Sequence, residues 1–311
     1  APPSPLKAPP MTTPRDLPQG ILAAALAYVI WGVVVVYWKL LPDVSPWEIL
    51  GHRVVWSVVV LLPVVLLFRR LPAVLAIFRN PRRAAALLLS SVLIAGNWGI
   101  FIWAVTEGRI IETSLGYYIN PLFAIALGVL LLGEKLSRLR IMAFVLAGIG
   151  VGVQAVALGG LPWISLVLAS SFAVYGYVRK VVQVEALDGL FIETLIVAPV
   201  ALIGFLLMMG QGELAFAHGD LVTDALLIGA GAVTALPLWL FAYGARSVRL
   251  STMGFLQYIA PTISLIIAVT VYDEPFGTVR LVSFSLIWAA LVLVSLEMFR
   301  RPVPVAPEEC R

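Results

Sequence analysis

The chain has 311 residues, of which 61% are hydrophobic and 12% are charged, and its mean hydropathy is +1.01. Soluble domains usually carry about a quarter charged residues, so this composition excludes a water-exposed globular protein. The formal net charge is +4, but the basic residues lie in short clusters between apolar segments, as they do in membrane proteins. We therefore expect the lipid bilayer, and no nucleic acid, as the surroundings of this chain.

The sequence offers few ligands for a metal. Its one cysteine, Cys310, has no partner for an intramolecular disulfide, and its two histidines are His52 and His218. We therefore expect no metal and no cofactor. The N-terminal segment 1–18 is rich in Pro, Thr and Ser, so it is predicted to be disordered. It also lacks the features of a signal peptide.

Ten segments are long and apolar enough to cross the membrane as helices, which takes about 20 residues each. The predicted spans are 20–41, 46–68, 84–106, 111–132, 138–158, 162–181, 188–209, 222–244, 250–271 and 278–299. The predicted fold class is therefore an all-α integral membrane protein with ten transmembrane helices.

The distribution of arginine and lysine predicts the orientation of these spans. With the N-terminus inside, 17 of the 21 basic residues fall in cytoplasmic segments, whereas Lys39, Arg109 and Arg280 fall outside. Cytoplasmic loops carry an excess of Lys and Arg. Both termini, including the tail 301–311, are thus expected on the cytoplasmic side.

The two halves of the sequence repeat each other. A Tyr-x-x-Pro pattern followed by Glu, which starts at Tyr118, recurs 140 positions later from Tyr258. Each predicted repeat, 19–159 and 160–300, holds five spans, so the second copy enters the membrane in the opposite sense. Inverted repeats are typical of transporters that bind substrate near the midplane, and they predict alternating access. The alternative is a duplication retained only for folding.

Two prolines occupy matching positions inside the fourth and ninth spans. Pro121 and Pro261 each remove a backbone donor and are expected to bend their helices. The bends are predicted to act as paired pivots or cavity walls, with plain kinks as the alternative.

Several segments carry a family resemblance. They are AYVIWG at 27–32, EILGHRVVWS at 48–57, NWGIFIWAV at 97–105, SLGYYINPL at 114–122 and GEK at 133–135. In these segments the chain resembles the drug/metabolite transporter superfamily, specifically the ten-helix EamA-type exporters and their RarD-like branch. The resemblance implies a bacterial inner-membrane exporter of small metabolites. A related YddG-like branch exports aromatic and other amino acids, so amino acids are the expected substrate class, with drugs or other amphipathic metabolites as the alternative.

Aromatic side chains with a polar tip suit a pocket for amphipathic small molecules such as amino acids or cationic and aromatic drugs. We expect the central cavity to be lined by Tyr28, Trp31, His52, Asn97, Trp98, Phe101, Tyr117, Tyr118, Tyr175, Trp239, Gln257 and Tyr258. Tryptophan and tyrosine also form belts at the membrane interface, and Trp38, Trp47 and Trp163 are expected to belong to such a belt.

The second span contains three ionisable residues close together. Glu48 and His52 are four residues apart and share a helix face, and Arg53 follows directly. His52 is interpreted either as a contact for substrate or a proton, or as a hydrogen-bonded residue near the interface. Glu48 and Arg53 are expected to pair with each other as a structural clamp.

An intramembrane enzyme is the remote alternative. It would need a Ser-His pair, two aspartates or metal ligands within the spans, and no such motif occurs in the sequence. No acidic residue lies in the middle of the first span, so the sequence does not predict proton or sodium coupling. The small-residue face from Gly148 to Gly152 is expected to pack within the chain, which leaves a monomer as the expected state.

Overall fold

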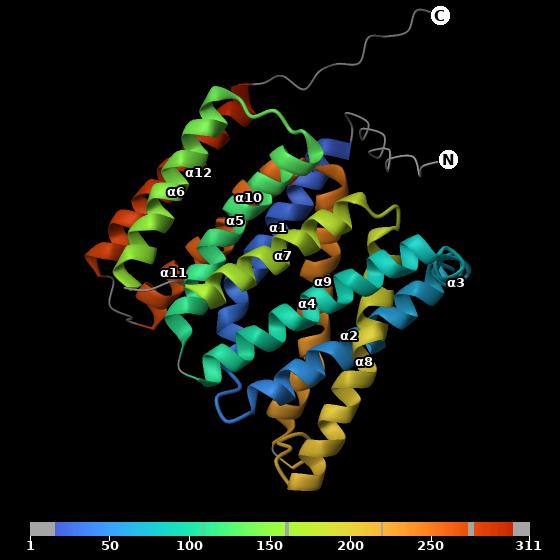
Figure 1. Cartoon of the computed structure of the whole chain (residues 1–311). Helices are drawn as coiled ribbons and strands as arrows, with labels where there is room; N and C mark the ends of the chain where they lie inside the picture. The colour runs from blue at the N-terminus through green and yellow to red at the C-terminus, as the bar shows by residue number, and fades with distance from the viewer. Residues whose placement is uncertain (1–15, 108, 159–161, 219, 273–276, 301–311) are drawn as a thin grey trace, which may run out of the picture.

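The computed structural model describes residues 16–107, 109–158, 162–218, 220–272 and 277–300, in which every regular element is an α-helix (Figure 1). The helices are α1 (Asp16–Trp38), α2 (Pro46–Leu67), α3 (Leu71–Phe78), α4 (Pro81–Thr106), α5 (Ile110–Leu132), α6 (Arg138–Leu158), α7 (Trp163–Val181), α8 (Ala186–Gln211), α9 (Leu221–Ser247), α10 (Leu250–Gln257), α11 (Ile259–Val271) and α12 (Thr278–Arg300).

These helices account for the ten predicted spans. The short α3 lies in the loop between the second and third spans, and α10 and α11 together form the ninth span. Within the described residues, nine stretches are long and apolar enough to cross a membrane. The chain is therefore a multi-pass membrane protein.

The tenth predicted span, α7, is absent from those nine for a physical reason. Arg179 and Lys180 lie in its last turn, and serine and tyrosine side chains lower its hydropathy further. It packs against α4, α5, α9 and α10, and its Ser165, Tyr175 and Arg179 side chains are buried within the protein. Figure 1 shows α7 crossing the bundle between these helices.

The helices pack in symmetric pairs. The repeat aligns α1 with α7, α2 with α8, α4 with α9, α5 with α10–α11, and α6 with α12. The contacts follow this alignment. The pair α1 and α9 corresponds to the pair α7 and α4, and the pair α2 and α9 corresponds to the pair α8 and α4. The pair α5 and α7 likewise corresponds to the contact of α10–α11 with α1. The remaining partners, α2 with α8 and α6 with α12, pack on each other. The fold thus consists of two inverted five-helix repeats.

The expected segment boundaries meet the described residues only in part. The helix α1 begins at Asp16, so the last three residues of the segment predicted to be disordered, 1–18, are helical. The rest of that segment, the junction 159–160 and the tail 301–311 lie outside the described residues. Glu274, the repeat partner of Glu134, lies outside them as well.

The two copies of the Tyr-x-x-Pro pattern meet at the centre of the bundle. The Tyr258 hydroxyl donates to the carbonyl of Tyr118 at 3.2 Å, which joins repeat-related residues. A Cβ at Gly254 would lie 2.7 Å from the Pro121 carbonyl oxygen, so only glycine allows this approach. The helix α5 continues through Pro121, whereas the ninth span is divided at Tyr258, three residues before Pro261. A proline leaves the carbonyl four residues earlier without its helical donor, which favours a break there.

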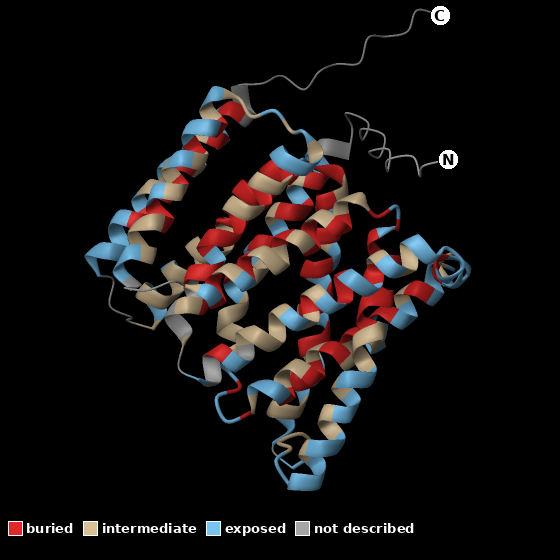
Figure 2. Ribbon diagram, in the orientation of Figure 1, coloured by how far each residue is buried: buried red, intermediate tan, exposed pale blue. Residues whose placement is uncertain are grey.

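Burial differs sharply along the ninth span. Seven of the eight residues of α10 are buried, whereas α11 has no buried residue among its 13 (Figure 2). The sequence of α11 is apolar throughout, so this difference reflects where α11 lies and not its composition.

We call the end of the bundle where α1 begins and α12 ends the terminal end (Figure 1). Arg70 makes two hydrogen bonds to Asp188 there, at 3.0 and 2.6 Å, and Arg246 lies 2.9 Å from Glu185. The hydrogen bond from Arg246 holds the pKa of the Glu185 carboxyl below its ordinary value, so this pair stays ionised at neutral pH.

The closest approach of the two repeats gives a test of the packing. A Cβ at Gly231 of α9 would overlap the backbone of Trp56 in α2, whereas a Cβ at Gly204 of α8 would meet nothing within 4 Å. We expect Gly231→Ala to destabilise the protein by about 1–3 kcal/mol through overpacking. Gly204→Ala, the matched control, should leave stability unchanged or slightly higher. Thermal unfolding in detergent measures both, and an equal effect of the two substitutions would contradict the helix pairing.

Candidate substrate-binding site

Arg53 is a charged residue within the apolar part of the bundle. It is the eighth residue of α2, about 10 Å along the helix from its first residue at 1.5 Å per residue. Its Nε donates to Thr234 Oγ1 at 3.0 Å, and Thr234 is the middle residue of α9. The guanidinium therefore points toward the membrane interior. A charge at this depth is costly unless it has a partner or faces water.

Two tryptophan rings hold the Arg53 side chain. Its Cζ lies 4.6 Å from the ring centre of Trp98 in α4 and 5.2 Å from that of Trp38 at the end of α1. Such contacts are attractive because the ring face is negative. Trp38, expected to belong to an interfacial belt, thus belongs to this group.

The terminal nitrogens of Arg53 are open. No carboxylate among the described residues lies within 4 Å of the guanidinium, and neither Nη makes a hydrogen bond. Neither Nη is among the buried polar atoms that lack a partner, so both are accessible. Arg53 thus has two Nη donors without a partner among the described residues.

Tyr117 and Phe101 extend this group from α5 and α4. Tyr117 is 51% exposed, and its hydroxyl is close enough to Arg53 for an electrostatic interaction. The Phe101 ring meets the Tyr117 ring edge to face, with 5.9 Å between the centres. We call Trp38, Arg53, Trp98, Phe101, Tyr117 and Thr234 the Arg53 site. It combines five helices from both repeats.

The expected clamp between Glu48 and Arg53 is wrong. The Glu48 carboxylate is fully buried and accepts hydrogen bonds from the backbone N–H groups of Ala215 and Phe216, at 3.0 and 2.8 Å. It holds the loop between α8 and α9 against α2. Backbone donors thus satisfy Glu48, and Arg53 is left for another partner.

His52 lies apart from the Arg53 site. It is 4% exposed, and its ring packs against Phe205 and Phe216 with centres 4.7 Å apart in each case. Its Nδ1 accepts from Trp56 Nε1 at 2.9 Å, and its Nε2 lies 3.8 Å from Glu48. This placement matches the structural interpretation of His52 as a hydrogen-bonded packing residue.

Three of the predicted residues form an aromatic cluster deeper in the bundle. Tyr28, Trp31 and Tyr175 pack around Phe172 and Phe241, with ring centres 5.5–6.2 Å apart. Tyr28 and Tyr175 are at most 1% exposed. The cluster joins α1, α7 and α9.

Gln257, Tyr258 and Tyr118 lie where α5 meets α10. Each is less than a tenth exposed. A cavity of about 10 Å³, lined in part by Gln257, Tyr28 and Asn120, lies beside them. This volume holds about one water molecule, so the cavity does not accommodate an amino acid in this conformation.

The remaining two predicted cavity residues are Asn97 and Trp239. Neither contacts the Arg53 site or the aromatic cluster in a way that indicates substrate binding. Asn97 Nδ2 donates to the carbonyl of Leu168 at 2.8 Å and to Ser171 Oγ at 2.9 Å, which ties α4 to α7. Trp239 is 36% exposed on α9.

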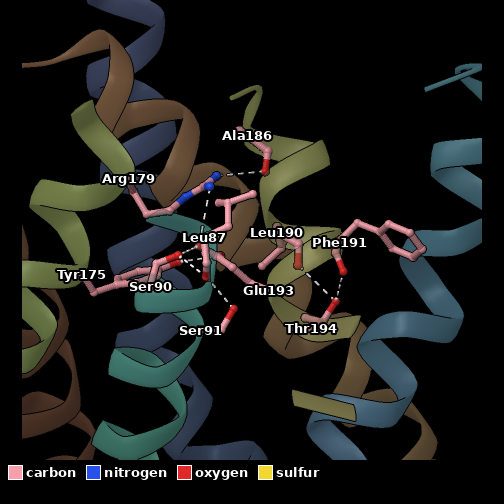
Figure 3. Close-up of polar contacts among 10 residues, drawn as sticks. All are labelled: Leu87, Ser90, Ser91, Tyr175, Arg179, Ala186, Leu190, Phe191, Glu193 and Thr194. Carbon is pink, nitrogen blue, oxygen red and sulfur yellow. Dashed lines mark hydrogen bonds and ion pairs between the residues drawn. The ribbon is translucent and has the colours of Figure 1, made fainter. Parts of the chain in front are cut away.

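A buried ionic network lies next to the aromatic cluster (Figure 3). The Glu193 carboxylate in α8 lies 3.6 Å from Arg179 Nη1, accepts from the Ser90 hydroxyl and lies 3.4 Å from the Tyr175 hydroxyl. Arg179 also donates to the Ala186 carbonyl at 3.1 Å. Arg179 is fully buried, so Glu193 supplies the charge that makes its burial tolerable.

A second small cavity connects this network with the Arg53 site. Its volume is about 20 Å³, and Trp98, Tyr175 and Glu193 contribute to its wall. Trp98 thus contacts Arg53 and also lines this cavity.

The sequence indicated some of these residues but not their roles. Arg53 and Glu193 were visible as charges within apolar segments, which is the signal for an intramembrane functional group. Thr234, Trp38 and Ser90 carried no such signal, since their roles depend on which helices pack together.

The Glu193 network predicts a large stability effect. Glu193→Gln leaves Arg179 buried without a counter-charge and should destabilise the protein by about 3–5 kcal/mol, or abolish folded yield. Adding Arg179→Met should recover part of that loss. Glu185→Gln, in a pair whose side chains are 31% and 57% exposed, is the matched control and should cost about 1 kcal/mol or less. Thermal unfolding in detergent measures these effects. A Glu193→Gln variant as stable as the wild type would contradict the role of Glu193 as the counter-charge of Arg179.

Comparison with known proteins agrees with this architecture. The model of the EamA-like transporter family matches residues 18–154. An "Uncharacterized transporter" of Vibrio cholerae is 44% identical over 91% of this chain and 94% of its own length. Protein RarD of Escherichia coli is 43% identical over 90% of this chain and 94% of its own length.

More distant similarity extends over the same region. The "Chloramphenicol-sensitive protein RarD" of Pseudomonas aeruginosa is 30% identical over 91% of this chain and 95% of its own length. A solved crystal structure superposes with a TM-score of 0.70 at 16% identity, over 91% of this chain and 99% of its own, and so shares the fold. The chain belongs to the EamA-like transporter family, as a RarD-like member of the drug/metabolite transporter superfamily.

Proposed function

We propose that this transporter exports small amphipathic metabolites, amino acids foremost, across the bacterial inner membrane by alternating access. The observation that carries the proposal is a difference between repeat-related positions. Tyr117 is 51% exposed, whereas its repeat partner Gln257 is 8% exposed. The same position is thus exposed in the first repeat and buried in the second.

The same difference extends along both helices. The helix α11 has no buried residue, whereas the repeat-related part of α5, 119–131, includes six. A span with one face on lipid and the other on protein would have buried residues on its protein face. The helix α11 contacts α1 closely at Gly32, so the absence of buried residues indicates that the contact covers α11 only in part.

The terminal end is closed in this conformation. Glu134, just after α5, accepts from the backbone N–H groups of Leu250 and Ser251 at 2.7 and 2.9 Å and from the Ser251 hydroxyl. It thereby satisfies free donors at the start of α10. Together with the Arg70–Asp188 pair, this contact joins the two repeats.

An exchange of the two repeat conformations would reverse the access. The first half of α5 would take the enclosed position that α10 now has, and the terminal end would open. The basic residues near the terminal end support a cytoplasmic location for it, as the distribution of Lys and Arg predicts. The present conformation is then open toward the outside.

The composition of the Arg53 site supports an amphipathic substrate. The Arg53 site offers aromatic rings for an apolar group and open donors for a polar one. Amino acids combine both features. Export of drugs is the second candidate, and the name of the P. aeruginosa relative, which mentions chloramphenicol, favours it.

Counterflow in proteoliposomes tests this function. Vesicles loaded with unlabelled L-phenylalanine should accumulate external labelled phenylalanine transiently and saturably, as should vesicles loaded with neutral amino acids. Trp98→Ala should raise the KM about tenfold, because it removes an aromatic wall of the site. Trp47→Ala, an exposed tryptophan at the start of α2, is the matched control and should leave the KM unchanged. Absence of counterflow with every amino acid, in folded protein, would transfer the assignment to other metabolites.

A further inference from the structure

We propose that Arg53 is the binding subsite for a carboxylate of the transported molecule, so that substrates are small carboxylic acids with an apolar or aromatic part and not amines. The inference rests on the proposed export function and names its substrate class.

The first argument is the matching of charges inside the bundle. Arg179 is matched by Glu193, Arg140 lies 3.4 Å from Glu297, and Asp188 is matched by Arg70. Glu48 and Glu134 bind backbone donors. Arg53 has no such match among the described residues, although it lies deeper than Arg70. A permanently charged group at this depth requires an anion or water.

The second argument is geometric. The Nε of Arg53 donates to Thr234, and the guanidinium contacts the rings of Trp98 and Trp38. This arrangement leaves the two Nη atoms, whose parallel N–H groups match the two oxygens of a carboxylate. The side chain is already ordered before substrate binds, so binding needs little loss of side-chain entropy.

The third argument concerns what the site rejects. Aromatic rings alone would also attract cations, so the aromatic residues of the sequence are compatible with cationic drugs as substrates. The positively charged guanidinium among those rings repels a cationic substrate. Tyr117 and Phe101 lie beside it and provide apolar surface for the rest of the substrate. The combination therefore selects an acid with an apolar group.

The experiment compares three probes that differ in one group, with phenyl phosphate as a fourth that carries a different anion. L-Phenylalanine has both an ammonium and a carboxylate, 3-phenylpropionate has the carboxylate alone, and 2-phenylethylamine has the amine alone. Binding to the purified wild-type protein is measured in detergent as thermal stabilisation against concentration. We expect both acids to bind and the amine not to bind. Equal binding of the amine, or binding of phenyl phosphate without binding of 3-phenylpropionate, would overturn the proposal.

Substitutions locate the effect at Arg53. Arg53→Gln should weaken the binding of both acids about 10- to 100-fold, the usual effect of losing charge-assisted hydrogen bonds. Arg53→Lys should retain part of the affinity, because it keeps the charge but loses the paired donors. Arg82→Gln, which removes an exposed arginine at the start of α4, is the matched control and should bind as wild type. Undiminished acid binding by Arg53→Gln would overturn the proposal even with normal folding of every variant.

The export function and the carboxylate subsite can be refuted independently. Amino-acid counterflow whose KM is unaffected by Arg53→Gln would retain the export function and remove the carboxylate subsite. Carboxylate-selective binding that depends on Arg53, without counterflow of any amino acid, would retain the subsite and remove the proposed transport of amino acids.

Discussion

Charge inside a lipid-embedded bundle has to be matched, and this constraint determines how the two repeats hold together. Glu193 matches Arg179 at the core of α7 and α8, and Glu134 satisfies the start of α10. Glu48 does the same for the loop after α8. The contacts of Glu134 and Glu48 join segments 116 and 168 residues apart in sequence, whereas Glu193 and Arg179 belong to consecutive helices. Among the residues that the structure describes, Arg53 lacks such a match, and this observation is the basis of the carboxylate subsite proposed above.

The inverted repeat explains why such a site can serve transport. Under the proposed alternating access, the symmetric helix pairs would allow a second conformation in which the roles of α5 and α10–α11 are exchanged. The contact between Tyr258 and Tyr118 joins repeat-related residues where α5 meets the ninth span. The exposed Tyr117 and the buried Gln257 are then two states of one repeated position. A substrate bound at Arg53 would lie between the repeats, where both conformations contact it.

The sequence predicted the fold in nearly full detail because lipid imposes apolar length and odd-numbered repeats impose inversion. It predicted less of the site. Trp98 and Tyr117 were predicted to line a cavity, but their position beside Arg53 was not predicted, since Glu48 and Arg53 are near neighbours and were expected to pair with each other. Which partner each takes depends on backbone donors of a loop more than 160 residues away. The division of the ninth span at Tyr258 likewise depends on tertiary packing as well as on Pro261, because α5 passes Pro121 unbroken.

The central claim is that the Arg53 site faces water on one side of the membrane at a time, and cysteine accessibility tests it most directly. In a Cys310→Ser background, Tyr117→Cys should react with a charged, impermeant maleimide added from the side opposite the terminal end, and excess L-phenylalanine should slow this reaction. Val92→Cys, at an exposed apolar position within α4, should stay unreactive. Tyr117→Cys that reacts only with a lipid-soluble maleimide, like Val92→Cys, would show that this surface faces lipid and would contradict the account.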